Sequence, residues 1–140
     1  MKNKQINPKD RKELSYPECY CSEQYHRFTL GKVVGTDGVV HAIEKANCHW
    51  MFSDAAIALD MVVAKKHPDK TAFLVWKIEV FEDDSAIVTA HTDSEENGSF
   101  SKTKLVYEQK YEYTTFKRET GCNYFEWYSQ DNVMLLKSEY

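Results

Sequence analysis

The sequence has no apolar run that approaches the roughly 20 residues that a helix needs to cross a membrane. Residues 1–18 are polar and lack the apolar segment of a signal peptide. We therefore expect a cytoplasmic protein that does not enter a membrane. In that compartment the four cysteines are expected to be reduced thiols.

The sequence also lacks an excess of positive charge. Its 22 acidic residues outnumber 18 basic residues, which gives a net charge of −4. Affinity for nucleic acid depends mainly on neutralising phosphates with Lys and Arg, so this balance argues against a nucleic-acid partner. The one basic cluster, Lys2 to Lys12, is interpreted as part of a solvated N-terminal arm.

Common catalytic signatures are missing as well. The chain has no Gly-rich phosphate loop, no H-E-x-x-H and no G-x-S-x-G. Cys48 and His49, near Asp54, could suggest a nucleophile with its base. Adjacent residues on a helix point about 100° apart, so Cys48 and His49 are not expected to face each other.

A zinc site is a second alternative. Its ligands would come from the Cys and His residues Cys19, Cys21, His26, Cys48 and His49. Zinc knuckles usually pair cysteines as C-x(2–4)-C, whereas Cys19-x-Cys21 is shorter and no second pair exists. We expect no metal site and no cofactor, and we interpret the thiols as small buried apolar groups.

What the sequence does contain is one apolar stretch without Pro or Gly, residues 49–66 (HWMFSDAAIALDMVVAKK). Apolar residues occupy nearly every side of its helical period, and Asp54 and Asp60 belong to a narrow polar seam. A helix that is apolar almost all round is usually buried, so this segment is predicted to be the central helix. A buried carboxylate needs a partner, and Arg27 or Lys77 could supply one.

A second helix is predicted over residues 37–46, with Thr36 as its N-cap and Asp37 at the positive end of its dipole. After Pro68 the apolar period changes from 3.6 to 2. Five strands are predicted from this alternation, over residues 73–81, 85–92, 102–116, 123–128 and 133–136. Polar turns join them, and Asn97-Gly98 marks one of these turns.

These elements predict an α+β fold, because short connections favour neighbouring antiparallel strands. We expect two main N-terminal helices packed on one face of a five-stranded, mostly antiparallel sheet. Residues 19–140 would form this single domain, and residues 1–18 a flexible N-terminal arm.

The predicted sheet is rich in aromatic residues. They are Tyr107, Tyr111, Tyr113, Trp127 and Tyr128. Such side chains can form the core with their hydroxyls at its rim, anchor a protein interface or stack nucleic-acid bases. The core is the ordinary interpretation, and the acidic balance makes base stacking the least favoured.

Several segments resemble a known family in their order and spacing. They are Ser22-Glu23-Gln24-Tyr25-His26-Arg27, Thr36-Asp37-Gly38-Val39, Trp50 with Asp54, Trp76, Tyr113-Thr114-Thr115-Phe116 and the ending Leu135-Leu136-Lys137-Ser138-Glu139-Tyr140. Over residues 19–140 the chain resembles the bacterial domain-of-unknown-function family 6876. The resemblance implies no known reaction or ligand, so no catalytic residue is carried over. It does imply a context, since such small domains resemble accessory proteins of phages, plasmids and other mobile elements.

Two hypotheses for function follow. The first is a non-enzymatic module that binds a protein, for example a mobile-element accessory protein that modulates host defence. Its candidate binding residues are Tyr107, Tyr111, Tyr113, Trp127, Tyr128, Glu23, His26, Asp37 and Asp54. The alternative is a small enzyme or nucleotide-binding domain that uses Ser22–His26, Thr36–Gly38 and Asp54, which requires these segments to meet in one pocket. A homodimer through an exposed strand edge is a further possibility.

Overall fold

A computed structural model describes residues 6–28, 31–92 and 104–140. The strands are β1 (Tyr25–Arg27), β2 (Val34–Thr36), β3 (Phe73–Val80), β4 (Ala86–His91), β5 (Leu105–Tyr111), β6 (Tyr124–Gln130) and β7 (Val133–Leu136). The helical segments are η1 (Pro8–Asp10), α1 (Asp37–Ala46), α2 (His49–Ala58), η2 (Leu59–Val63), α3 (Ala64–Lys66), η3 (Pro68–Lys70), α4 (Phe116–Thr120) and η5 (Lys137–Glu139). The predicted turn at Asn97-Gly98 lies outside the described residues.

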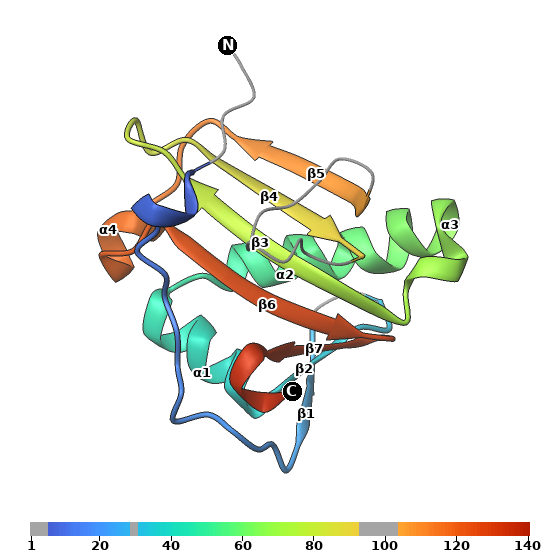
Figure 1. Cartoon of the computed structure of the whole chain (residues 1–140). Helices are drawn as coiled ribbons and strands as arrows, with labels where there is room; N and C mark the ends of the chain where they lie inside the picture. The colour runs from blue at the N-terminus through green and yellow to red at the C-terminus, as the bar shows by residue number, and fades with distance from the viewer. Residues whose placement is uncertain (1–5, 29–30, 93–103) are drawn as a thin grey trace.

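The strands form one seven-stranded sheet in the order β1-β2-β7-β6-β3-β4-β5 (Figure 1). The pairing of β2 with β7 is parallel, through Val34 opposite Val133, while the other neighbours are antiparallel. The α+β class is therefore confirmed, but the prediction of a five-stranded, mostly antiparallel sheet is wrong. The sheet has two more strands and is mixed.

The predicted order of helices and strands is also wrong. The two main helices are not N-terminal, because β1 and β2 precede α1 and place the helices in the middle of the chain. Each of these two strands has 3 residues, too few to show the alternation that identifies a strand. The β2–β7 pairing joins distant parts of the chain, which turn lengths cannot reveal.

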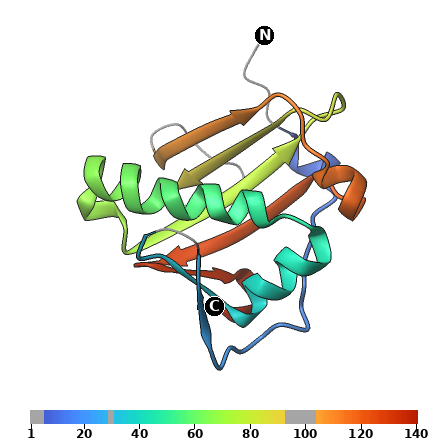
Figure 2. The ribbon, with the colours of Figure 1, turned by 180° about the vertical axis from the view of Figure 1, so that it is seen from behind.

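One face of the sheet carries α1, α2 and α3 (Figures 1 and 2). The run from His49 to Lys66 is helical as predicted, with a π-helical segment, η2, between α2 and α3. Phe52 and Leu59 are buried in the core, whereas Ile57 is 39% and Met61 55% exposed. The expectation that this helix is buried on all sides is therefore wrong, since one stripe faces away from the sheet. No helix within the described residues is both long and apolar enough to cross a bilayer.

The α1 helix covers the β2–β7 end of the same face. Thr36 is its N-cap as predicted, and the Thr36 hydroxyl accepts a hydrogen bond from Val39 N at 3.3 Å. The helix ends at Asn47, which has a left-handed backbone conformation with φ 51°. This conformation suits Asn and ends the helix two residues before α2 begins at His49.

The opposite face of the sheet is partly covered by the N-terminal segment. Leu14 N donates to Tyr124 O at 2.8 Å, and Ile6 N donates to the Glu79 carboxylate at 2.8 Å. Glu79 pairs with Lys77 at 2.5 Å, and both side chains are only 2% exposed. The division into a flexible arm and a domain stays a prediction, but residues 12–14 hydrogen-bond with β6 and the residue before it.

Candidate functional site

Three segments that lie far apart in the sequence meet at the N-terminus of α1. They are the loop before β1, the start of α1 itself and η5. The Glu139 carboxylate lies against the N-terminus of α1 from η5. Its Oε1 accepts from the Thr36 hydroxyl at 2.5 Å, and its Oε2 accepts from Gly38 N at 3.0 Å. The first backbone N–H groups of a helix have no partners within it, and they carry the positive end of the dipole. Glu139 therefore satisfies a free donor and supplies a favourable negative charge.

Gly38 is what permits this approach. A Cβ atom at position 38 would collide with the Glu139 carboxyl group. Oε1 of Glu139 also accepts from Leu136 N at 2.9 Å, so the carboxylate is held from its own segment as well. The pair Gly38 and Glu139 thus fastens the end of β7 to the start of α1.

A second carboxylate, Asp37, ties the preceding loop to the same helix end. Its Oδ1 lies 2.7 Å from His26 Nε2, and its Oδ2 accepts from Glu23 N at 3.0 Å. The Ser22 hydroxyl accepts from Asp37 N at 2.9 Å. The hydrogen bond to His26, followed by that from Glu23, lowers the pKa of Asp37.

The structure therefore brings together two of the three segments that the enzyme hypothesis requires, Ser22–His26 and Thr36–Gly38. Asp54 is elsewhere. Its carboxylate accepts from the Tyr111 hydroxyl at 2.7 Å, on β5, at the opposite edge of the sheet from β1. Its expected partners, Arg27 or Lys77, are replaced by a tyrosine.

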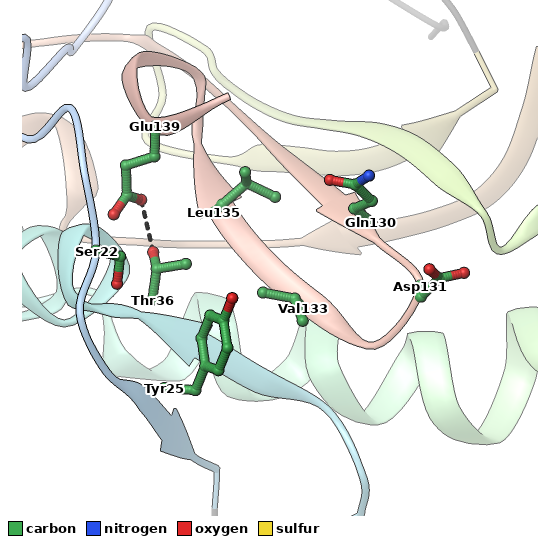
Figure 3. Close-up of a pocket in the computed structure, with 8 residues that line it drawn as sticks. All are labelled: Ser22, Tyr25, Thr36, Gln130, Asp131, Val133, Leu135 and Glu139. Carbon is green, nitrogen blue, oxygen red and sulfur yellow. Dashed lines mark hydrogen bonds between the residues drawn. The ribbon is translucent and has the colours of Figure 1, made fainter.

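A groove of about 410 Å³ lies beside this helix end (Figure 3). We call it the β7 groove. Tyr25, Val133 and Leu135 form its sides and floor. Ser22, Thr36 and Glu139 are at one end, and Gln130 and Asp131 at the other.

The β7 groove opens on the face of the sheet opposite to α1 and α2. Met134 and Leu136 belong to the core, so Val133 and Leu135, which alternate with them, point to the other face. Leu135 is paired across the sheet with Tyr128. Tyr128 begins a cluster of three rings with Phe73 and Tyr140, whose centroids lie 5.0 to 5.3 Å apart. This aromatic cluster continues the apolar side of the groove.

Ser22, His26 and Asp37 are the residue types of a catalytic triad, but their arrangement is a different one. The Ser22 hydroxyl donates to Gln24 O at 3.0 Å and accepts from the backbone of Asp37. Within the described residues no hydrogen bond joins Ser22 to His26. A nucleophile must be within hydrogen-bond reach of its base. These contacts instead hold the loop before β1 against the start of α1.

The structure does not favour Cys48 as a nucleophile, an arrangement that the sequence already argued against. Its thiol is buried and lies 3.6 Å from Ala42 O. Burial raises the pKa of Cys48 to about 12, and the reactive form of a cysteine is the thiolate. His49 contacts Ser53 on the helix surface instead. The suggested zinc ligands also separate, because Cys48 lies in the core while Cys21 is exposed.

The predicted aromatic residues do not form one surface. Trp127 is fully buried and stacks on Trp76, with 6.0 Å between ring centroids. Tyr107 packs against Trp76 and Tyr111 against Trp50, both at the β5 side. Tyr113 is 54% exposed beyond the end of β5. Of this group, Tyr128 alone lies next to the β7 groove.

Sequence reasoning did not select Val133, Leu135 and Glu139 as site residues, and it included Tyr25 only as part of the segment Ser22–His26. Two of the segments on which the family resemblance rests, Thr36–Val39 and the ending that contains Glu139, nevertheless contact each other through Gly38 and Glu139. The available signal was Gly38 at the second position of the predicted helix, where a carboxylate such as that of Glu139 can approach the backbone. The distance between the two segments along the chain concealed their pairing.

Comparison with known proteins identifies a family but no activity. No curated protein and no solved structure matches this chain. The model of the family of unknown function DUF6876 matches residues 10–140. Since this match covers most of the sequence, the chain belongs to the family of unknown function DUF6876.

Proposed function

We propose that this chain is a non-enzymatic binding module for a protein partner, and that the β7 groove with its aromatic cluster receives that partner. The observation that carries the proposal is the exposure of two large aromatic residues beside an apolar floor. Tyr25 is 67% and Tyr140 71% exposed. Exposed tyrosines around an apolar centre, with polar groups at the rim, are typical of protein interfaces.

The polar groups near the groove favour binding over catalysis. Glu139 is engaged by Thr36 and Gly38, and Asp37 by His26 and Glu23. Carboxylates whose oxygens already accept hydrogen bonds that hold the fold are poor candidates for moving protons or attacking a substrate. A partner can instead use the tyrosine side chains and the apolar floor without breaking these contacts.

The biological setting belongs to the same proposal. A cytoplasmic accessory protein of a phage or another mobile element, acting on host defence, is supported by the family resemblance alone. The partner would then be a host protein. We propose that the host protein contacts the β7 groove. The proposed biological setting does not depend on where the contact lies.

The experiment compares partner binding by two variants, each of which replaces an exposed tyrosine, one at the groove and one away from it. Proteins cross-linked to the wild-type chain in a lysate of its source organism are identified, and the strongest candidate is purified for titration. Tyr25→Ala is expected to weaken its binding about tenfold or more, as for an interface residue worth about 1.4 kcal/mol. Tyr113→Ala, a matched exposed tyrosine away from the groove, should leave the affinity unchanged.

Two results would contradict the assignment. Equal affinities of the Tyr25→Ala variant and the wild type would place the contact elsewhere. Equal losses in the Tyr25→Ala and Tyr113→Ala variants would show that binding is not localised at the groove. Circular dichroism of each variant excludes unfolding as the cause.

A small enzyme or nucleotide-binding domain is the second candidate, favoured by the meeting of Ser22–His26 with Thr36–Gly38. A helix N-terminus can bind phosphate, but here Glu139 occupies it. Thermal-shift measurements with nucleotides test this candidate. A rise in Tm that the Tyr25→Ala variant retains and a His26→Ala variant loses would support this candidate over protein binding.

A homodimer through the sheet edge would be a different kind of assembly. The strand β5 is last in the strand order and carries exposed Glu108, Gln109 and Lys110, and charged residues on an edge strand oppose pairing with another chain. We therefore propose self-association as the weaker alternative for the partner. Light scattering at high protein concentration tests it, and a monomeric mass would exclude it.

A further inference from the structure

Glu18, Cys19 and His41 bring three metal-ligating side chains together outside the β7 groove. A carboxylate oxygen of Glu18, the Cys19 Sγ and an imidazole nitrogen of His41 all lie within 4.8 Å of one another. Glu18 Oε2 and His41 Nε2 are 3.1 Å apart. We propose that these three residues bind a divalent transition-metal ion of the zinc class.

The donor atoms determine the class of metal. Zinc accepts thiolate, imidazole and carboxylate ligands in a tetrahedral arrangement, with bonds of about 2.0 to 2.3 Å. Ligand atoms around such an ion lie about 3 to 4 Å apart, so small side-chain rotations suffice here. Thiolate and imidazole favour Zn²⁺ or Co²⁺ over Mg²⁺ and Ca²⁺, which take oxygen ligands.

The protein supplies three ligands and leaves the fourth position to solvent. The Glu18 side chain is 59% exposed, and that of His41 31%. Water or a ligand from solution can therefore reach an ion held at this place. Three protein ligands with an open position are typical of zinc sites that exchange a ligand.

The backbone around these ligands is fixed by contacts that do not need the ion. Cys19 N donates to Tyr16 O at 3.0 Å, and the Ser138 hydroxyl donates to Tyr16 O at 3.0 Å and to Cys19 O. The Tyr16 ring meets the His41 imidazole edge-on, with centroids 5.1 Å apart. The loop and α1 thus present the ligands from two segments that are already in place.

The competing interpretation is an ion pair between Glu18 and His41 that binds no metal, with no role for the Cys19 thiol. A cobalt titration of the full chain, with all cysteines reduced, separates the two. Tetrahedral Co²⁺ with a thiolate ligand shows intense visible bands and a thiolate-to-metal charge-transfer band. We expect these bands to saturate at one equivalent and to disappear when excess Zn²⁺ is added.

The variants test which residues hold the ion. Cys19→Ser is expected to remove the charge-transfer band, and Cys19→Ser and His41→Gln should each lower the apparent affinity more than about tenfold, since even residues behind a ligand cost that much. Cys21→Ser is the matched control, because it removes an exposed cysteine two positions away. It should leave both bands and affinity unchanged.

Three outcomes would overturn the site. They are the absence of tetrahedral bands in the wild type, their persistence in Cys19→Ser, and their loss in Cys21→Ser. A readout independent of colour is the melting temperature. Bound Zn²⁺ should raise it in the wild type and in Cys21→Ser but not in His41→Gln, whereas a bare ion pair predicts no shift in any of the three.

Discussion

Gly38 donates its backbone N–H to the Glu139 carboxylate, which lies so close that a side chain at position 38 would collide with it. The hydrogen bond is 3.0 Å long, and the space that a Cβ would need is filled by the carboxylate. The interaction couples a backbone requirement at the start of α1 to a charged residue near the end of the chain. The carboxylate leaves no room for a side chain at position 38, and the free N–H of Gly38 provides a donor for the acidic residue at position 139.

Gly38→Ala is expected to destabilise the protein. In an exposed helix the same change stabilises by roughly 0.5 to 1 kcal/mol, but here the methyl group must displace Glu139. Overpacking of this kind costs about 1 to 3 kcal/mol. Urea denaturation measures the free energy of unfolding.

The control for this prediction is the same substitution in a Glu139→Ala background. Without the carboxylate the collision is absent, so Gly38→Ala should there be neutral or stabilising. Such a difference between the two backgrounds measures the coupling of the pair. Equal costs in both backgrounds would show that Glu139 is not what restricts position 38.

The Asp37–His26 contact predicts a stability that depends on pH on the acid side. The pKa of Asp37 is lowered from its ordinary value of 3.8, first by the hydrogen bond to His26. The unfolded chain therefore binds a proton at Asp37 at a higher pH than the folded chain. The stabilisation is fully present above the unfolded pKa and is lost as pH falls through the folded pKa.

His26→Ala is expected to move the pKa of Asp37 back toward its ordinary value. The carboxyl resonance of Asp37, followed by NMR during an acid titration, measures this directly. His49→Ala, which removes a histidine that contacts Ser53 instead, is the matched control. An unchanged Asp37 titration in His26→Ala would refute the role of His26.

Tyr111→Phe tests the contact that replaces the expected partner of Asp54. The hydroxyl donates to Asp54 at 2.7 Å, and burial followed by this hydrogen bond raises the pKa of Tyr111. Loss of one such hydrogen bond costs about 0.5 to 1.5 kcal/mol of folding free energy. Thermal unfolding monitored by circular dichroism provides the measurement.

Tyr107→Phe is the matched change on the same strand, where the hydroxyl makes one long contact among the described residues, 3.4 Å to Gln109. It should cost less than Tyr111→Phe. Similar losses in the two variants would mean that the Asp54 hydrogen bond contributes nothing of its own.

Cys48 is predicted to be unreactive in the folded protein. Its pKa of about 12 and its burial leave almost no accessible thiolate near neutral pH. A thiol reagent such as dithiobis-nitrobenzoate should label exposed Cys21 rapidly and Cys48 only after unfolding in urea. Peptide mass spectrometry assigns the labelled residues, and early labelling of Cys48 would contradict its position in the core.

The elements with strong periodic patterns were predictable from sequence. The helix over 37–46 with its Thr36 cap, the helical run from His49 to Lys66 and five of the strands were expected. Their signals are local, because capping residues and apolar periods act within a few positions. The burial of Lys77 with Glu79 was not predictable, since it depends on a covering segment from elsewhere in the chain.

The candidate site was predictable only in fragments. Ser22–His26 and Thr36–Gly38 were selected together, and they do meet. The groove beside them was missed because Val133 and Leu135 were interpreted only as a last strand. Tyr25 was included only as part of Ser22–His26, since a strand of 3 residues shows no recognisable pattern. Nothing in their spacing shows that β7 lies beside β2.

That neighbour relation has a consequence for synthesis on the ribosome. β2 gains its parallel partner only when Val133 and Met134 arrive, long after α1 and α2 could have formed. Before that point, β2 has β1 as a possible strand partner but lacks β7 on its other side. Pairings between such remote positions form slowly, so the pairing of β2 with β7 is expected to be a late event in maturation.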